Sequence, residues 1–181
     1  MIPEFPNFKK LELLDKKDVE KFTFQFPPYS DFNFFSMWGW DIHHKMMISQ
    51  LNDNLVVLFN DYISGESFLS FVGDKKIIET TSKLISFSEE KYHKNFLKLI
   101  PEEILLSFKG SQFTVKADRD SYDYIYLVEH LANMNKWTRN TSGKRVRKFL
   151  ETHFGYDVRH SSVQEISSNE YEVMFHRWAE S

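Results

Sequence analysis

Apolar residues recur along this chain with two different periods, one typical of helices and one typical of strands. Spacings of three and four residues predict helices at 15–26, 31–38, 74–87, 128–134 and 146–154, with two more beginning at Pro101 and Ser168. Short apolar or alternating runs predict strands at 8–14, 46–49, 55–60, 67–72, 113–117 and 156–160, and residues 96–100 are expected to be extended. Because helices and strands are interspersed and joined by short links, the pattern predicts an α+β fold.

Local signals mark several of the boundaries. Asp31 is the expected N-cap of the helix at 31–38. Gly155 is expected to end the helix at 146–154. The polar residues at 52–54 predict the turn of a hairpin. The sequence shows neither an internal repeat nor a linker, so we expect residues 1–181 to form a single domain.

Composition narrows the class of protein. The chain contains 18 Phe, 8 Tyr and 4 Trp, which predicts a globular domain with a core rich in phenylalanine. It contains no cysteine, which excludes disulfides, thiolate catalysis and cysteine-ligated metal centres. The N-terminus lacks a signal-peptide pattern, and no apolar run approaches the ~20 residues needed to span a bilayer. We therefore expect a cytoplasmic protein without a transmembrane segment.

Charge is distributed unevenly, although the formal net charge is only −3. Six basic residues occur between positions 136 and 148 without an intervening acid: Lys136, Arg139, Lys144, Arg145, Arg147 and Lys148. The small residues at 140–143 predict a turn inside this run, directly ahead of a helix. Backbone N–H groups at a helix start, with cations beside them, suit an anionic ligand. This stretch is the leading candidate for a functional site.

Three segments resemble one family in their order and spacing. They are YSDFNFFSMW at 29–38, ESFLSFVG at 66–73, and DRDSYDYIY at 118–126, which is followed by Leu131 and the basic stretch. Together they resemble the phosphatidylglycerol lysyltransferase C-terminal-domain-like family of bacterial proteins, which carry two fused GNAT-type acyltransferase folds. The resemblance covers most of residues 8–156, although Asn135-Lys136 stands where members usually have Lys-Gly.

The resemblance implies a GNAT-like mixed sheet flanked by helices. It matches the N-terminal copy of the family, and we expect the chain to lack the second GNAT copy. The implied activity is transfer of an acyl or aminoacyl group from acyl-CoA or aminoacyl-tRNA to an amine or hydroxyl acceptor. Acyl-CoA would then be the cofactor, and no metal is expected.

The resemblance also implies a set of site residues. In GNAT enzymes a glycine-containing turn ahead of a helix binds the pyrophosphate of coenzyme A through backbone N–H groups. RNTSGK at 139–144 is a loose match with one glycine instead of two, so anion or cofactor binding falls to Ser142, Gly143 and the six basic residues. Tyrosine is the usual general acid in such sites, which makes Tyr124 and Tyr126 the catalytic candidates.

The basic stretch also supports a hypothesis without catalysis. Its cations would suit the phosphates of tRNA or the head groups of anionic lipids, and the chain would then be a binding or assembly domain. A third interpretation is a solvated helix face balanced by Glu129, Glu151 and Asp157. The sequence leaves the transferase and the binding domain open as alternatives.

The remaining polar residues give weaker signals. Asp118, Asp120 and Asp123 lack the glycine and glutamate of an EF-hand, so capping and turn formation are expected of them. The alternating tyrosines at 122, 124 and 126 are expected to share one strand face and to line the core or a groove. His43-His44 and the pair Glu172 and His176 each lack a third metal ligand.

The aromatic residues near the first predicted cap also allow two interpretations. We expect them mainly to form core, and the competing hypothesis is a docking patch for a second GNAT-like domain or for another copy of the chain. The residues concerned are Phe32, Phe34, Phe35, Trp38 and Trp40, with Met174, Phe175 and Trp178 near the C-terminus. A homodimer is the simplest assembly that would cover such a patch.

Overall fold

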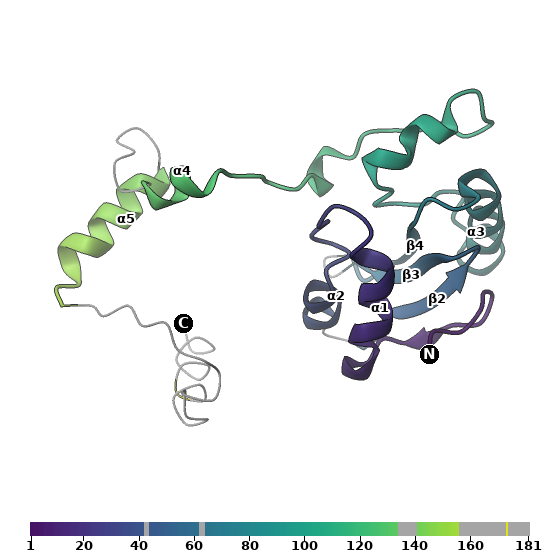
Figure 1. Ribbon diagram of the computed structural model, residues 1–181, viewed down its shortest axis with the longest axis horizontal. Coiled ribbons are helices and arrows are strands. Elements are labelled where there is room, and N and C mark those ends of the chain that lie inside the picture. Colours follow the sequence, from purple (N-terminus) through teal and green to yellow (C-terminus); the bar gives the residue numbers. More distant parts are fainter. Residues whose placement is uncertain (42–43, 62–63, 134–140, 156–172, 174–181) are drawn as a thin grey trace. The chain divides into compact units, whose positions relative to one another are not determined.

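The computed structural model describes residues 1–41, 44–61, 64–133, 141–155 and 173 (Figure 1). The chain divides into two compact units, Met1–Tyr124 and Ile125–Ser181. The first unit holds the sheet. The described part of the second unit holds two helices, α4 (Val128–Ala132) and α5 (Thr141–Thr152).

The first unit is built on a four-stranded antiparallel sheet with the strand order β1-β2-β3-β4 (Figure 1). The strands are β1 (Lys9–Lys10), β2 (Met47–Leu51), β3 (Asn54–Asn60) and β4 (Ser67–Val72). The mixture of this sheet with helices agrees with the predicted α+β class. The strands predicted at 46–49, 55–60 and 67–72 lie at or close to their predicted positions, and the first strand is shorter than predicted.

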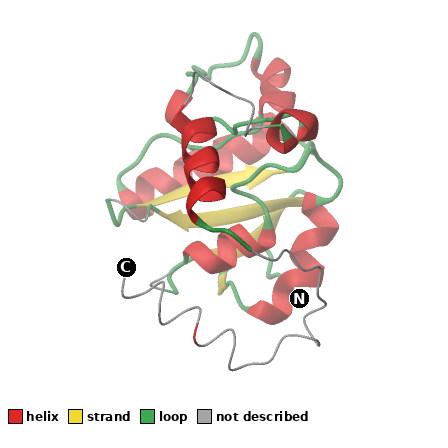
Figure 2. Ribbon diagram, turned by 90° about the vertical axis from the view of Figure 1, so that its left-hand side faces the viewer, coloured by secondary structure: helices red, strands yellow, loops and turns green. Residues whose placement is uncertain are grey.

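Helices cover both faces of this sheet (Figure 2). The helices of the first unit are α1 (Lys16–Thr23), α2 (Phe34–Trp40) and α3 (Ile77–Tyr92), with 3-10 helices η1 (Leu13–Asp15), η2 (Glu102–Phe108) and η3 (Arg119–Ser121). Buried residues of α1 and α2 pack on one face, and those of α3 and η2 pack on the other. The fold is therefore a layer of strands between two layers of helices.

Strand β3 supplies core residues to both layers. Leu55, Val57 and Phe59 belong to the cluster with α1 and α2. Val56 and Leu58, which point to the opposite face, belong to the cluster with α3 and η2. This arrangement explains why β3 is apolar at successive positions and not only at alternate ones.

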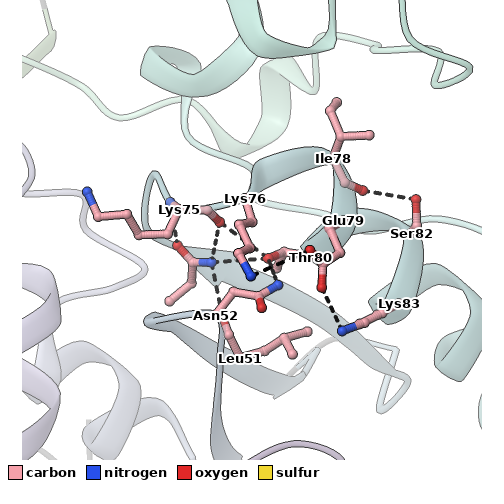
Figure 3. A network of polar contacts seen from close by, with 10 residues as sticks. Leu51, Asn52, Lys75, Lys76, Ile78, Glu79, Thr80, Ser82 and Lys83 are labelled. Atoms are coloured by element: carbon pink, nitrogen blue, oxygen red, sulfur yellow. Dashed lines mark hydrogen bonds and ion pairs between the residues drawn. The ribbon is translucent and has the colours of Figure 1, made fainter.

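The buried side chain of Asn54 connects the start of β3 to the segment between β4 and α3, and its partners Leu51, Lys75 and Thr80 are labelled in Figure 3. Its Nδ2 donates to the carbonyls of Leu51 (3.0 Å) and Lys75 (2.8 Å) and to the Thr80 hydroxyl (3.1 Å). Its Oδ1 accepts the N–H of Lys75 at 3.0 Å. Gly73 allows this approach, because a Cβ there would lie 2.0 Å from Oδ1 and the residue has a φ of +150°.

The outer edge of β4 is covered by the segment predicted to be extended at 96–100. The Lys98 N–H donates to the Leu69 carbonyl at 3.2 Å, and the Ser70 hydroxyl donates to the Leu99 carbonyl at 3.1 Å. Leu99 has a φ of +56°, so the segment lies against β4 without continuing as a strand.

Two local predictions in the first unit are wrong. The side chain of Asn33, not that of Asp31, caps α2, since its Oδ1 accepts the N–H groups of Phe35 (3.0 Å) and Ser36 (3.4 Å). Residues 113–117 form no strand. Phe113 instead packs edge-on against the buried Phe108, with ring centroids 6.0 Å apart. It therefore contributes to the core without being part of a strand.

We predict that Asn54→Ala lowers the free energy of unfolding by about 2–3 kcal/mol, because it leaves several buried backbone groups without partners. Urea denaturation followed by circular dichroism measures this change. Ser82→Ala is the matched control, since that hydroxyl donates only to the Ile78 carbonyl of its own helix at 2.9 Å. The control should change the free energy by less than about 0.5 kcal/mol. Equal effects of the two substitutions would contradict the role of Asn54.

Candidate functional site

Four of the predicted anion-binding cations lie on α5: Lys144, Arg145, Arg147 and Lys148. Ser142 and Gly143 lie in the first turn of the same helix. Lys136 and Arg139 lie outside the described residues. The structure therefore brings six of the eight predicted residues onto one helix.

The turn predicted at 140–143 is not seen in its described part. The helix α5 begins at Thr141, ahead of the predicted start at Val146. Gly143 disfavours a helix by only about 1 kcal/mol relative to alanine, whereas the lysines and arginines that follow are good helix formers. A single early glycine therefore does not delay the start of this helix.

The helix α5 is amphipathic. Val146, Phe149 and Leu150 fall on one side at the helical period of about 100° per residue, and the cations fall on the other side. Lys144, Arg145 and Lys148 are exposed, and among the described residues no ion pair is recorded for these three side chains. Their charge is therefore available to an anionic partner.

The tyrosines predicted to alternate on a strand are not in a strand. Tyr122, Tyr124 and Tyr126 have exposed fractions of 59%, 86% and 55%, which contradicts the expected lining of a core or groove. The alternation of aromatic residues did not indicate a strand here, because residues 122–127 pair with no neighbouring strand. Exposed phenols still suit contact with a ligand, but Tyr124 and Tyr126 belong to different units.

A polar cluster in the first unit joins two of the segments that carry the family resemblance. The backbone N–H of Ser30 donates to Asp123 Oδ2 at 3.2 Å, and the Ser30 hydroxyl donates to Oδ1 of the same carboxylate. The neighbouring Tyr29 hydroxyl donates to Glu103. Residues 29–31 thus lie beside carboxylates that come from much later in the sequence.

The electrostatics of this cluster favour protons and cations. Burial raises the pKa of the Asp31 carboxyl above its ordinary value of 3.8, and the negative charge of Asp123 adds to the effect. Burial also raises the pKa of the Tyr29 hydroxyl above 10.0, with Glu103 as the next cause. Such groups hold a proton more tightly than usual, which is a property shared by many general acids and cation sites.

The sequence reasoning missed this cluster as a site. It assigned Asp31 to helix capping and Asp123 to turn formation, because nothing local relates residues so distant in the chain. The available signal was that both belong to segments of the family resemblance. No sequence motif marks the acidic residues of this cluster.

The described residues offer neither a metal site nor a membrane-spanning helix. No group of three or more His, Asp or Glu side chains in the described part of the chain is arranged to hold a metal ion. The described helices are also too short or too polar to cross a membrane. Of the two histidine-containing pairs noted in the sequence, His43, Glu172 and His176 lie outside the described residues.

Comparison with known proteins gives no match: neither a protein-family model, nor a curated protein, nor a solved structure resembles this chain significantly. The function therefore has to be argued from the chain's own residues.

We predict that Asp31→Asn raises stability at neutral pH. A carboxyl whose pKa is higher in the folded state makes the folded protein bind more protons, so the free energy of unfolding falls as pH rises above 3.8 and through the folded-state pKa. The variant should lose this decline and match the wild type only below pH 3.8. Urea denaturation across the pH range measures the difference.

The exposed carboxylate Asp120 provides the control for this experiment. Asp120→Asn should leave the pH dependence of the wild type in place. If Asp31→Asn were less stable than the wild type at pH 7, the carboxylate would be making favourable contacts and the argument from burial would be wrong.

Proposed function

We propose that this chain is a binding domain that attaches to an anionic surface through α5. The supporting observation is the separation of exposed cations from apolar side chains on that helix. Lys144 and Lys148 are four residues apart, so both extend from the same side of the helix, and Arg145 lies next to them. A row of cations on one side of a helix attracts a surface that carries many negative charges.

An anionic lipid surface fits α5 and its surroundings better than a nucleic acid does. The second unit exposes large apolar side chains together with its cations, and these are Ile125, Leu127, Val128, Leu131, Phe149 and Phe154. Phosphates of tRNA would use only the cations. A lipid surface would use both, because head groups bind the cations and the acyl boundary accepts apolar side chains.

A GNAT-related acyl- or aminoacyltransferase is the second candidate. It is supported by the α+β arrangement and by the position of Ser142 in the first turn of α5, where backbone N–H groups of a helix lack intrahelical acceptors. The donor phosphates of acyl-CoA or aminoacyl-tRNA would bind near Ser142–Arg145, and Tyr126, which belongs to the same unit, would supply the proton. The acceptor would be an amine or hydroxyl group.

We predict that the double substitution Lys144→Ala, Lys148→Ala weakens binding to vesicles of phosphatidylglycerol and phosphatidylcholine. A cation near an anionic surface contributes about 1 kcal/mol, so the loss of two corresponds to roughly 30-fold in affinity. Co-sedimentation with vesicles at low and high salt measures this loss. Binding should also decrease as salt increases.

The double substitution Lys83→Ala, Lys91→Ala is the matched control. These exposed lysines of α3 are paired with Glu79 (2.7 Å) and Glu90 (2.9 Å). Their loss should leave vesicle binding nearly unchanged. Binding of tRNA without binding of vesicles would refute the lipid surface as the partner, and failure to bind either would refute the proposal.

For the transferase candidate, we predict that acetyl-CoA raises the melting temperature in a saturable manner that persists at high salt. A ligand at about 100 times its Kd stabilises the folded state by roughly 2.7 kcal/mol. Differential scanning fluorimetry with acetyl-CoA, free coenzyme A and tRNA makes the comparison. The absence of any shift with the two coenzyme A compounds would contradict this candidate.

A further inference from the structure

A hollow of about 170 Å³ lies in the first unit, where the chain passes from α1 to α2. Five aromatic side chains and one acid are among the residues that line it: Phe24, Phe26, Tyr29, Phe32, Phe34 and Glu20. We propose that this hollow binds a small methylated alkylammonium ion. The proposal does not depend on α5 or on the function proposed for it.

Both buried and exposed aromatic residues line the hollow. Phe32 and Phe34 are buried, with exposed fractions of 3% and 2%, so they are fixed by the core. Phe24 is 78% exposed and is available to a ligand that enters from solvent. The faces of aromatic rings attract cations, and several rings around one site are the usual means of binding a methylated ammonium group.

Glu20 supplies the opposite charge and is the charged side chain that lines the hollow in the described part of the chain. Its Oε1 lies 3.6 Å from the Lys16 ammonium. That ammonium also sits 4.9 Å from the centre of the Phe35 ring, and neither Lys16 nor Phe35 lines the hollow. The carboxylate therefore remains beside the rings while its own partner is held on the neighbouring surface.

The wider surroundings of the hollow are also acidic. Tyr29, whose ring lines the hollow, donates its hydroxyl to Glu103, and Glu102 acts on the same hydroxyl. Asp31 follows Tyr29 by two residues, and the Asp123 carboxylate accepts the N–H of the intervening Ser30. This negative charge favours a cation over a neutral molecule and disfavours an anion.

The type of cation follows from the scarcity of hydrogen-bond acceptors. Most side-chain oxygens of the lining are already engaged: the Tyr29 hydroxyl with Glu103, Asn33 Oδ1 with two backbone N–H groups, and the Glu20 carboxylate with Lys16. The Thr23 hydroxyl is the remaining side-chain acceptor among the described lining residues. A primary ammonium carries three N–H donors that would lose water without adequate replacement. A methylated ammonium carries few or none, so it can give up its water against carbon surfaces at much lower cost.

The test is a titration of the full chain with choline and, in parallel, with its neutral isostere 3,3-dimethyl-1-butanol. Isothermal calorimetry gives the affinities, and ¹H–¹⁵N spectra locate the contact through shifts of residues 20–34. The two probes have nearly the same shape, so their difference reports the charge. We expect choline to bind about five-fold more tightly or better.

Two variants and one control locate the site. Glu20→Gln removes the charge and keeps the shape, and Phe24→Ala removes an exposed ring that the core does not need. Each should weaken choline binding about three- to ten-fold and leave the melting temperature nearly unchanged. Trp38→Ala is the control, because this side chain is 42% exposed on α2 and lies outside the hollow. It should leave choline binding unchanged.

A short peptide containing one trimethyllysine forms a further arm that identifies the source of the cation. Tighter binding of the peptide than of choline assigns the hollow to a protein side chain, and equal or weaker binding assigns it to a free small molecule. Either result supports the ligand class. Equal binding of choline and its neutral isostere, no binding of either, or loss of binding in Trp38→Ala alone would overturn the proposal.

Discussion

Burial of β3 on both faces is the constraint on which the first unit depends. Leu55 and Val57 face one helical layer while Val56 and Leu58 face the other, so both layers must form before the strand is removed from water. The polar end of the strand is closed by Asn54, which satisfies the backbone where the hairpin meets α3. The sheet and the helices are therefore stabilised together rather than one after the other.

Elements with a strong local signal were predictable from the sequence. The hairpin of β2 and β3 and the helix α3 follow from apolar runs, turn residues and helical spacing that no distant contact overrides. The capping of α2 was not predictable, because Asp31 and Asn33 are both good N-caps and their spacing to the apolar residues does not distinguish them. The predicted start of α5 was too late because the small residues at 140–143 favour a turn, whereas the helix already begins at Thr141.

The side chains that could bind a ligand or take part in a reaction are divided between the two units. The basic helix is contiguous in the sequence, so its charge and its periodicity could both be seen without a structure. The acidic and aromatic region around Tyr29 is assembled from segments far apart in the chain, and only folding brings Glu103 and Asp123 to it. The two proposals therefore assign partners of opposite charge to the two units.

The covered edge of β4 has a consequence for behaviour at high concentration. An exposed strand edge is a template on which another molecule can add a strand, and such addition leads to aggregation. Here the bonds between Lys98 and Leu69 and between Ser70 and Leu99 occupy part of that template, while the left-handed backbone of Leu99 prevents the covering segment from becoming a new edge strand. At the opposite side of the sheet, β1 spans only Lys9–Lys10, too short and too charged to nucleate growth. The sheet therefore ends at both sides in features that oppose self-association through its strands.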